Sequence, residues 1–219
     1  MDIHHIPITR QARYYTLGEL NAKTTQIYIV LHGYGQLASQ IIRKFDKMPS
    51  DVFIIAPEGL SRFYWDGTKG HVGASWMTKE DRNYEIEEYC NFLQAVFDHF
   101  ILSMPNNALV NVLGFSQGGA TAMRWLLLKQ PSKINNIILW GSDTPPELDY
   151  KNTQSYLSDK ELFWVYGNKD EYLPNQRIEQ LEKRFVQFQL SPKTIVFEGG
   201  HELHRPTLVD LHQHFSKKQ

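Results

Sequence analysis

The stretch NVLGFSQGGATAM, residues 111–123, passes from an apolar segment into glycine and serine and then back into apolar residues. This pattern predicts a buried strand, a turn and a helix, with Ser116 at the turn. Gly114 and Gly118 give the spacing G-x-S-x-G, which suits a turn where strand and helix pass too closely for side chains. The context predicts that Ser116 is a nucleophile, held above a sheet at the positive end of a helix.

Short apolar segments alternate with helical patterns along the rest of the chain. Strands are predicted at 26–33, 51–59, 108–115, 134–142, 161–170 and 193–200. Helices are predicted at 38–48, 83–102, 118–130, 175–189 and 206–217. Because parallel strands need helical crossovers, this order predicts an α/β fold with a mostly parallel central sheet covered by helices on both faces. Residues 12–20 are expected to add an antiparallel strand.

The length of the chain and its connections predict a single domain over residues 1–219. The chain has 219 residues, of which 42% are hydrophobic, enough for one well-buried core. The connection between the strands at 134–142 and 161–167 is too short for a large cap domain. One long stretch, 58–81, is expected to be irregular, and irregular loops of this length in compact domains are usually functional.

Charge, cysteine content and hydropathy exclude several classes of function. The net charge of −1 gives no electrostatic reason to expect binding to nucleic acid or to an anionic membrane. Cys90 is the one cysteine, so no intrachain disulfide is possible, which fits a reducing compartment. The N-terminus lacks the pattern of a signal peptide, and no apolar run approaches the roughly 18 residues of a membrane span. We therefore expect a soluble, cytoplasmic protein with no membrane-spanning segment.

A serine hydroxyl is a weak nucleophile and needs a base that is oriented by a third group. His201, in GGHELH (199–204), directly follows a predicted strand and is the expected base. Asp170, just past the apolar segment ELFWVYG (161–167), is the expected acid, with Asp143 and Glu171 as alternatives.

No metal site and no cofactor are predicted. The sequence HELH (201–204) is one residue too short for the H-E-x-x-H spacing of a zinc helix.

An oxyanion hole needs two backbone N–H groups directed at the developing negative charge. The residue after the nucleophile, Gln117, is expected to supply one of them. The glycine-rich stretch LHGYGQ (31–36) follows an earlier strand, and the N–H of Tyr34 is expected to supply the other.

Five motifs occur in a collinear order over residues 26–204: LHGYGQ, SWM, GFSQGG, GNKDEYLP and GGHEL. Together they resemble the phospholipase/carboxylesterase family of α/β-hydrolases, which includes acyl-protein thioesterases and small carboxylesterases. Gln36 and Met77 depart from this pattern, where the family often carries Asp and Phe. The resemblance implies an α/β-hydrolase fold and the hydrolysis of carboxylic esters or thioesters without a cofactor.

The residues themselves predict an acyl-transfer hydrolase. A serine peptidase or amidase and a non-catalytic binding protein on the same fold are the alternatives. The expected partner is a small ester or thioester, or an acylated protein; the oligomeric state stays open. Residues 60–77 are expected to line the acyl-binding groove through Trp65, Trp76 and Met77, although both tryptophans could instead pack into the core.

Overall fold

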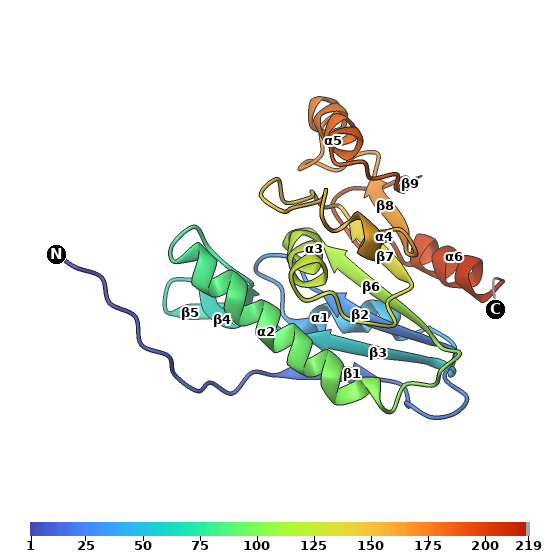
Figure 1. Cartoon of the computed structure of the whole chain (residues 1–219), viewed down its shortest axis with the longest axis horizontal. Coiled ribbons are helices and arrows are strands. Elements are labelled where there is room, and N and C mark those ends of the chain that lie inside the picture. Colours follow the sequence, from blue (N-terminus) through green and yellow to red (C-terminus); the bar gives the residue numbers. More distant parts are fainter. Residues whose placement is uncertain (218–219) are drawn as a thin grey trace.

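The computed structural model describes residues 1–217, which form a mostly parallel sheet with helices on both faces (Figure 1). The strands of this sheet are β1 Tyr14–Leu17, β2 Gln26–Leu31, β3 Val52–Pro57, β6 Leu109–Phe115, β7 Asn136–Trp140, β8 Glu161–Gly167 and β9 Lys193–Phe197. The helices are α1 Ala38–Ile41, α2 Arg82–Ile101, α3 Gln117–Lys129, α4 Gln154–Leu157, α5 Asn175–Gln187 and α6 Arg205–Ser216, with a 3₁₀ turn at Ile42–Phe45.

The strand order of the sheet is β1-β3-β2-β6-β7-β8-β9. Strand β1 pairs antiparallel with β3, and all the other pairs are parallel. The predicted α/β class and the predicted antiparallel first strand are therefore confirmed. The chain moves outward from β2 to β3 and then returns to the other side of β2 as β6. The carboxyl ends of β2 and β6 thus flank the point where the order reverses, and ligands bind at such points in open α/β sheets.

Both faces of the sheet are buried because successive side chains on a strand point to opposite sides. In β2, Ile27, Ile29 and Leu31 pack into a core that contains side chains of α2, α3 and α5. Tyr28 and Val30 of the same strand pack into a second core with side chains of α1 and α6. This explains why β2 is apolar from Ile27 to Leu31 rather than alternating between apolar and polar residues.

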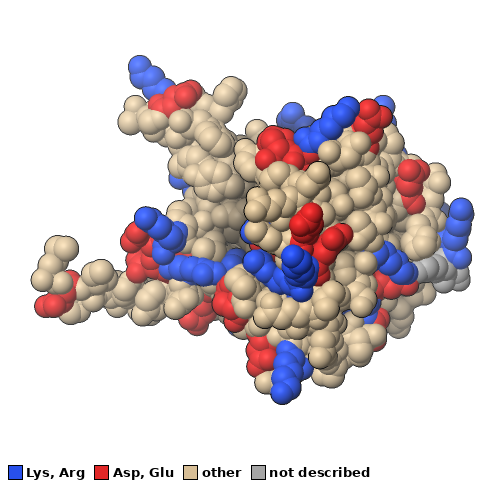
Figure 2. Space-filling model, turned by 90° about the horizontal axis from the view of Figure 1, so that it is seen from above, with Lys and Arg blue, Asp and Glu red and all other residues tan. Residues whose placement is uncertain are grey.

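The stretch predicted as a long irregular loop is largely a β-hairpin. Strand β4 (Ser61–Asp66) pairs antiparallel with β5 (Lys69–Ser75), and the register shifts between Tyr64 and Asp66. Figure 1 shows this hairpin at the side of the molecule to which the N-terminal segment extends, and Figure 2 shows a lobe that projects from the body on that side. The prediction of an irregular stretch was therefore wrong over residues 61–75.

The helix predicted over 38–48 is also shorter than expected. Only Ala38–Ile41 is α-helical, and the chain continues as the 3₁₀ turn Ile42–Phe45. Ile41, Ile42 and Phe45 are all buried. The segment packs its apolar side chains on the sheet through this tighter turn.

Candidate active site

Ser116 occupies the turn between β6 and α3 in a conformation that is unusual for a residue with a side chain. Its backbone angles are φ 54° and ψ −121°, and its N–H donates to the carbonyl of Trp140 at 2.8 Å. A Cβ on Gly114 would lie 2.4 Å from the carbonyl oxygen of Gly118, and one on Gly118 would lie 2.2 Å from that of Leu31. Only glycine fits at either position, so the two glycines permit the strained turn at Ser116.

The structure brings His201 and Asp170 into direct contact. His201 Nδ1 lies 2.8 Å from Asp170 Oδ2, and the side chains are 11% and 1% exposed. The other oxygen of Asp170 accepts the N–H of Tyr172 at 2.9 Å. The ring of His201 also lies 4.8 Å from the ring of Phe115, the residue before Ser116. This arrangement engages Nδ1 with Asp170 and places the imidazole beside the residue that precedes Ser116.

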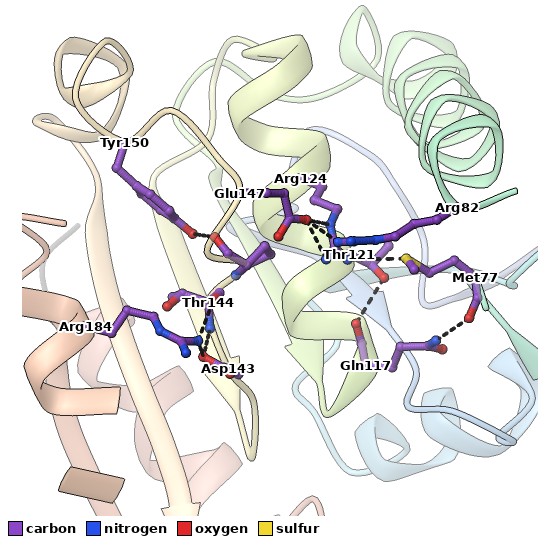
Figure 3. A network of polar contacts seen from close by, with 11 residues as sticks. Met77, Arg82, Gln117, Thr121, Arg124, Asp143, Thr144, Glu147, Tyr150 and Arg184 are labelled. Atoms are coloured by element: carbon purple, nitrogen blue, oxygen red, sulfur yellow. Dashed lines mark hydrogen bonds and ion pairs between the residues drawn. The ribbon is translucent and has the colours of Figure 1, made fainter. Parts of the chain in front are cut away.

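The two alternative acids have other surroundings. Asp143 forms ion pairs with Arg177 and Arg184 of α5. Its Oδ1 also accepts the N–H of Thr144, and Figure 3 shows Asp143 between Thr144 and Arg184. Glu171 is exposed. Asp143 therefore ties α5 to the segment after β7, whereas Asp170 is the carboxylate at the imidazole.

His32, at the end of β2, is buried and was not singled out from the sequence. Its Nδ1 lies 2.8 Å from the carbonyl oxygen of Gly33, and its Nε2 accepts the N–H of Gly59 at 2.9 Å. These partners fix the neutral tautomer with the proton on Nδ1. Burial lowers the pKa of His32 to about 4, although the hydrogen bond to Gly33 acts in the opposite direction. The position of a histidine between a strand and a glycine was the signal that could have identified it.

The loop after β2 has its backbone groups engaged on both sides of Tyr34. The N–H of Gly33 donates to Gln36 Oε1 at 3.0 Å, and the N–H of Gly35 donates to the carbonyl of Ala74 at 2.8 Å. A Cβ on Gly33 would lie 3.1 Å from the Cβ of Ser116. The loop is therefore fixed and lies against the candidate nucleophile.

The side chain of Gln117 links the turn to the segment that follows β5. Its Nε2 donates to the carbonyl of Met77 at 2.9 Å, and its Oε1 accepts the N–H of Trp76 at 3.2 Å. Figure 3 shows this contact next to the half-buried Met77, whose sulfur lies 3.6 Å from a guanidinium nitrogen of Arg124. Glu147 accepts hydrogen bonds from Arg124 and from Arg82, which connects α3 and α2 to the loop after β7. The side chain of Gln117 thus holds in place the segment that contains Trp76 and Met77.

The two tryptophans named from the sequence have different environments. Trp65 is 54% exposed, and its indole N–H donates to the carbonyl of Gly35 at 3.1 Å. Its ring lies in an aromatic cluster with Tyr34 and Phe63 beside the loop after β2. Trp76 is instead 1% exposed, stacks on His32 and donates to its carbonyl oxygen at 2.8 Å. Trp76 therefore packs into the core, which was the stated alternative to a place in the wall of the acyl-binding groove.

Residues 17–219 match the family model described as phospholipase/carboxylesterase. The chain belongs to this family. This match confirms the resemblance that the five motifs indicated, and it covers nearly the whole sequence of this phospholipase/carboxylesterase family member.

Solved structures resemble this family member along most of their length. A Zea mays acyl-protein thioesterase 2 has a TM-score of 0.71 at 14% identity, with 94% of this chain and 99% of that chain covered. A carboxylesterase from Mesorhizobium loti has a TM-score of 0.71 at 15% identity, with 94% of each chain covered. A Bacillus cereus carboxylesterase has a TM-score of 0.65 at 14% identity, again with 94% of each chain covered. These likenesses establish the α/β-hydrolase fold.

A sequence comparison with curated proteins found no match. Over residues 1–217, no helix combines the length and the apolar character needed to cross a bilayer. In the same part of the chain, no group of three or more His, Cys, Asp or Glu side chains is arranged to hold a metal ion.

Proposed function

We propose that the protein is a serine hydrolase that cleaves carboxylic esters or thioesters through an acyl-enzyme. The contact between His201 Nδ1 and Asp170 Oδ2 carries this proposal, because it orients a base beside the strained turn of Ser116. The family of the chain supports the same class of reaction.

In this reaction Ser116 Oγ attacks the acyl carbonyl while His201 Nε2 takes the hydroxyl proton. The tetrahedral intermediate then expels the alcohol or thiol, which receives the proton from His201. Water next attacks the acyl-enzyme with His201 again as the base, and the acid product leaves. Asp170 keeps Nδ1 protonated and stabilises the imidazolium that forms in each half of the reaction.

The N–H groups of Tyr34 and Gln117 are the proposed oxyanion hole. The carbonyl of Gly33 and the N–H of Tyr34 belong to the same trans peptide, so they point in opposite directions. The carbonyl of Gly33 faces the ring of His32. The N–H of Tyr34 is therefore directed away from His32 between two engaged N–H groups, those of Gly33 and Gly35. Gln117 is the first residue of α3, where the N–H has no acceptor within the helix. Both donors thus belong to backbone that other contacts hold in place.

The aromatic cluster of Tyr34, Phe63 and Trp65, in which Tyr34 and Trp65 are exposed, is the proposed wall for the acyl chain, with Met77 close to Gln117. Apolar walls with few polar groups suit an acyl chain. The proposed substrates are small esters or thioesters, and an acylated protein is a further candidate because one structural neighbour is an acyl-protein thioesterase.

The proposal is tested by labelling with a fluorophosphonate, followed by mass spectrometry of the modified peptide. We expect stoichiometric modification at Ser116 and loss of both labelling and turnover in Ser116→Ala, by about 10⁴-fold to 10⁶-fold in rate. The substrate class follows from kcat/KM for p-nitrophenyl esters of increasing chain length against matching thioesters. Turnover by Ser116→Ala within about tenfold of the wild type would exclude the serine mechanism.

A further inference from the structure

A cavity of about 160 Å³ lies beside His201 and is not used by the acyl-binding wall proposed above. It is bounded by the loop after β2, by α1 with its 3₁₀ turn, by the end of β6 and by the loop after β9. Its lining residues are Gln36, Gln40, Ile41, Lys44, Phe115, His201, Glu202 and Leu203. The cavity therefore touches the proposed general base, the residue before the nucleophile and the oxyanion loop at once.

The polar groups that line this cavity are mainly donors. Gln36 Oε1 already accepts the N–H of Gly33, and Gln40 Oε1 already accepts the N–H of Leu37. Each amide therefore has its NH₂ group left for a ligand. The half-buried Lys44 adds a positive charge with three N–H donors.

The remaining walls limit what the donors can bind. Ile41, Phe115 and Leu203 are buried and apolar. Glu202, which is exposed, is the one carboxylate in the lining. A cavity of about 150 Å³ accommodates a molecule of the size of benzene, so this one suits a group of about six non-hydrogen atoms. These properties favour a small group that ends in an anionic acceptor.

The position of the cavity beside His201 relates it to the departure of the alcohol or thiol. The carbonyl carbon under attack becomes bonded to Ser116, while the departing oxygen or sulfur must meet the proton on His201 Nε2. A pocket lined by His201 and by Phe115 is consequently adjacent to the departing group.

We propose that this cavity binds the leaving group, and that the preferred leaving group is a small alcohol or thiol bearing a carboxylate or a similar anion. The inference rests on the proposed function. In the step concerned, the bond between the acyl carbon and the oxygen or sulfur breaks, its electron pair stays on that atom, and the proton of His201 neutralises it. Lys44, Gln36 and Gln40 hold the anionic end during this transfer, without taking part in the proton movement.

The test compares two substrates of nearly the same shape, the anionic S-acetyl thioglycolate and the neutral S-acetyl thioglycolamide, by the release of free thiol. The measured quantity is the kcat/KM ratio of the anionic to the neutral thioester. We expect Lys44→Ala to lower this ratio by roughly three- to tenfold, as for a partly exposed charged hydrogen bond, and Lys44→Glu to lower it further. Lys44→Arg should retain the ratio of the wild type. Lys47→Ala is the matched control, since Lys47 is exposed and does not line the cavity.

The same ratio in the wild type and in Lys44→Glu would overturn the proposed subsite. A second measurement does not depend on turnover. It uses NMR to determine the affinities of thioglycolate and of thioglycolamide for Ser116→Ala. We expect tighter binding of the anion, lost when Lys44→Glu is added, and equal binding of the two would also overturn the subsite. If neither thioester nor any p-nitrophenyl ester is cleaved, the proposed function fails, while this binding measurement still decides the subsite.

Discussion

Nδ1 of His201 lies 2.8 Å from Oδ2 of Asp170, whereas the carboxylate of Asp143 is bound by Arg177 and Arg184. Both aspartates follow neighbouring strands of one sheet, so position along the chain does not separate them. What separates them is which charged side chain each one meets. Asp143 meets two guanidinium groups of α5, and Asp170 meets the imidazole.

This difference predicts opposite phenotypes for the two conservative variants. Asp170→Asn should lower kcat by about 10²-fold to 10⁴-fold with little change in KM, because the imidazolium loses its partner and the tautomer is no longer fixed. Asp143→Asn should keep kcat within about tenfold of the wild type but lower the free energy of unfolding by about 1 kcal/mol, because two ion pairs are weakened. Steady-state kinetics and urea unfolding of both variants check this. If kcat falls strongly in Asp143→Asn but not in Asp170→Asn, Asp143 and not Asp170 is the acid.

Trp65 should determine the preference for acyl-chain length. Trp65→Ala removes an exposed ring from the aromatic cluster, so kcat/KM for long-chain p-nitrophenyl esters should fall about fivefold or more relative to the acetate ester. Tyr64→Ala is the matched control, because Tyr64 is similarly exposed but lies on the opposite face of the hairpin. Equal effects of the two substitutions on the chain-length profile would argue against the groove.

Trp76 should act through stability and not through chain-length preference. Trp76→Ala removes a buried ring that stacks on His32, so we expect a loss of about 3–5 kcal/mol in the free energy of unfolding. Turnover of short and long esters should fall by the same factor. Thermal unfolding and the ester series measure the two effects, and a selective loss of long-chain turnover in a fully stable variant would contradict this role.

The buried His32 should make the protein less stable in mild acid. Its pKa is lowered to about 4 in the folded state, compared with about 6.5 in an unfolded chain. Between these values the unfolded state binds more protons, so stability falls as the pH drops from about 6.5 to about 4, by up to about 3 kcal/mol. Urea unfolding over this range measures the slope. In His32→Gln the slope should be smaller, and an unchanged slope would assign the effect to other groups.

Cys90 should be inert in the folded protein. Burial raises the pKa of its thiol to about 12, so at pH 8 only about 10⁻⁴ of it is the reactive thiolate. Iodoacetamide should leave turnover unchanged and should modify Cys90 only after unfolding, as read by mass spectrometry. Rapid inactivation by iodoacetamide, absent from Cys90→Ser, would show that this thiol is accessible.

Some features of this protein follow from local chemistry, and its sequence determined them. The order of strands and helices follows from apolar periodicity, and the turn at Ser116 follows from Gly114 and Gly118, because no side chain fits where β6 and α3 cross. His201 and Asp170 were also predicted from their positions after strands, where functional residues of a parallel sheet gather.

Only the tertiary structure decided the features that depend on distant partners. Residues 61–75 form a hairpin because Phe63 and Trp65 pack against Tyr34 and Gly35, a contact between segments that no local pattern records. Trp76 can be buried because both of its N–H groups have acceptors. Its indole N–H donates to the carbonyl of His32, and its backbone N–H donates to the side chain of Gln117. Likewise, α5 supplies the arginines that engage Asp143 and so distinguish it from Asp170. Local sequence sets which elements form, whereas burial and charge pairing between remote segments set which side chains meet.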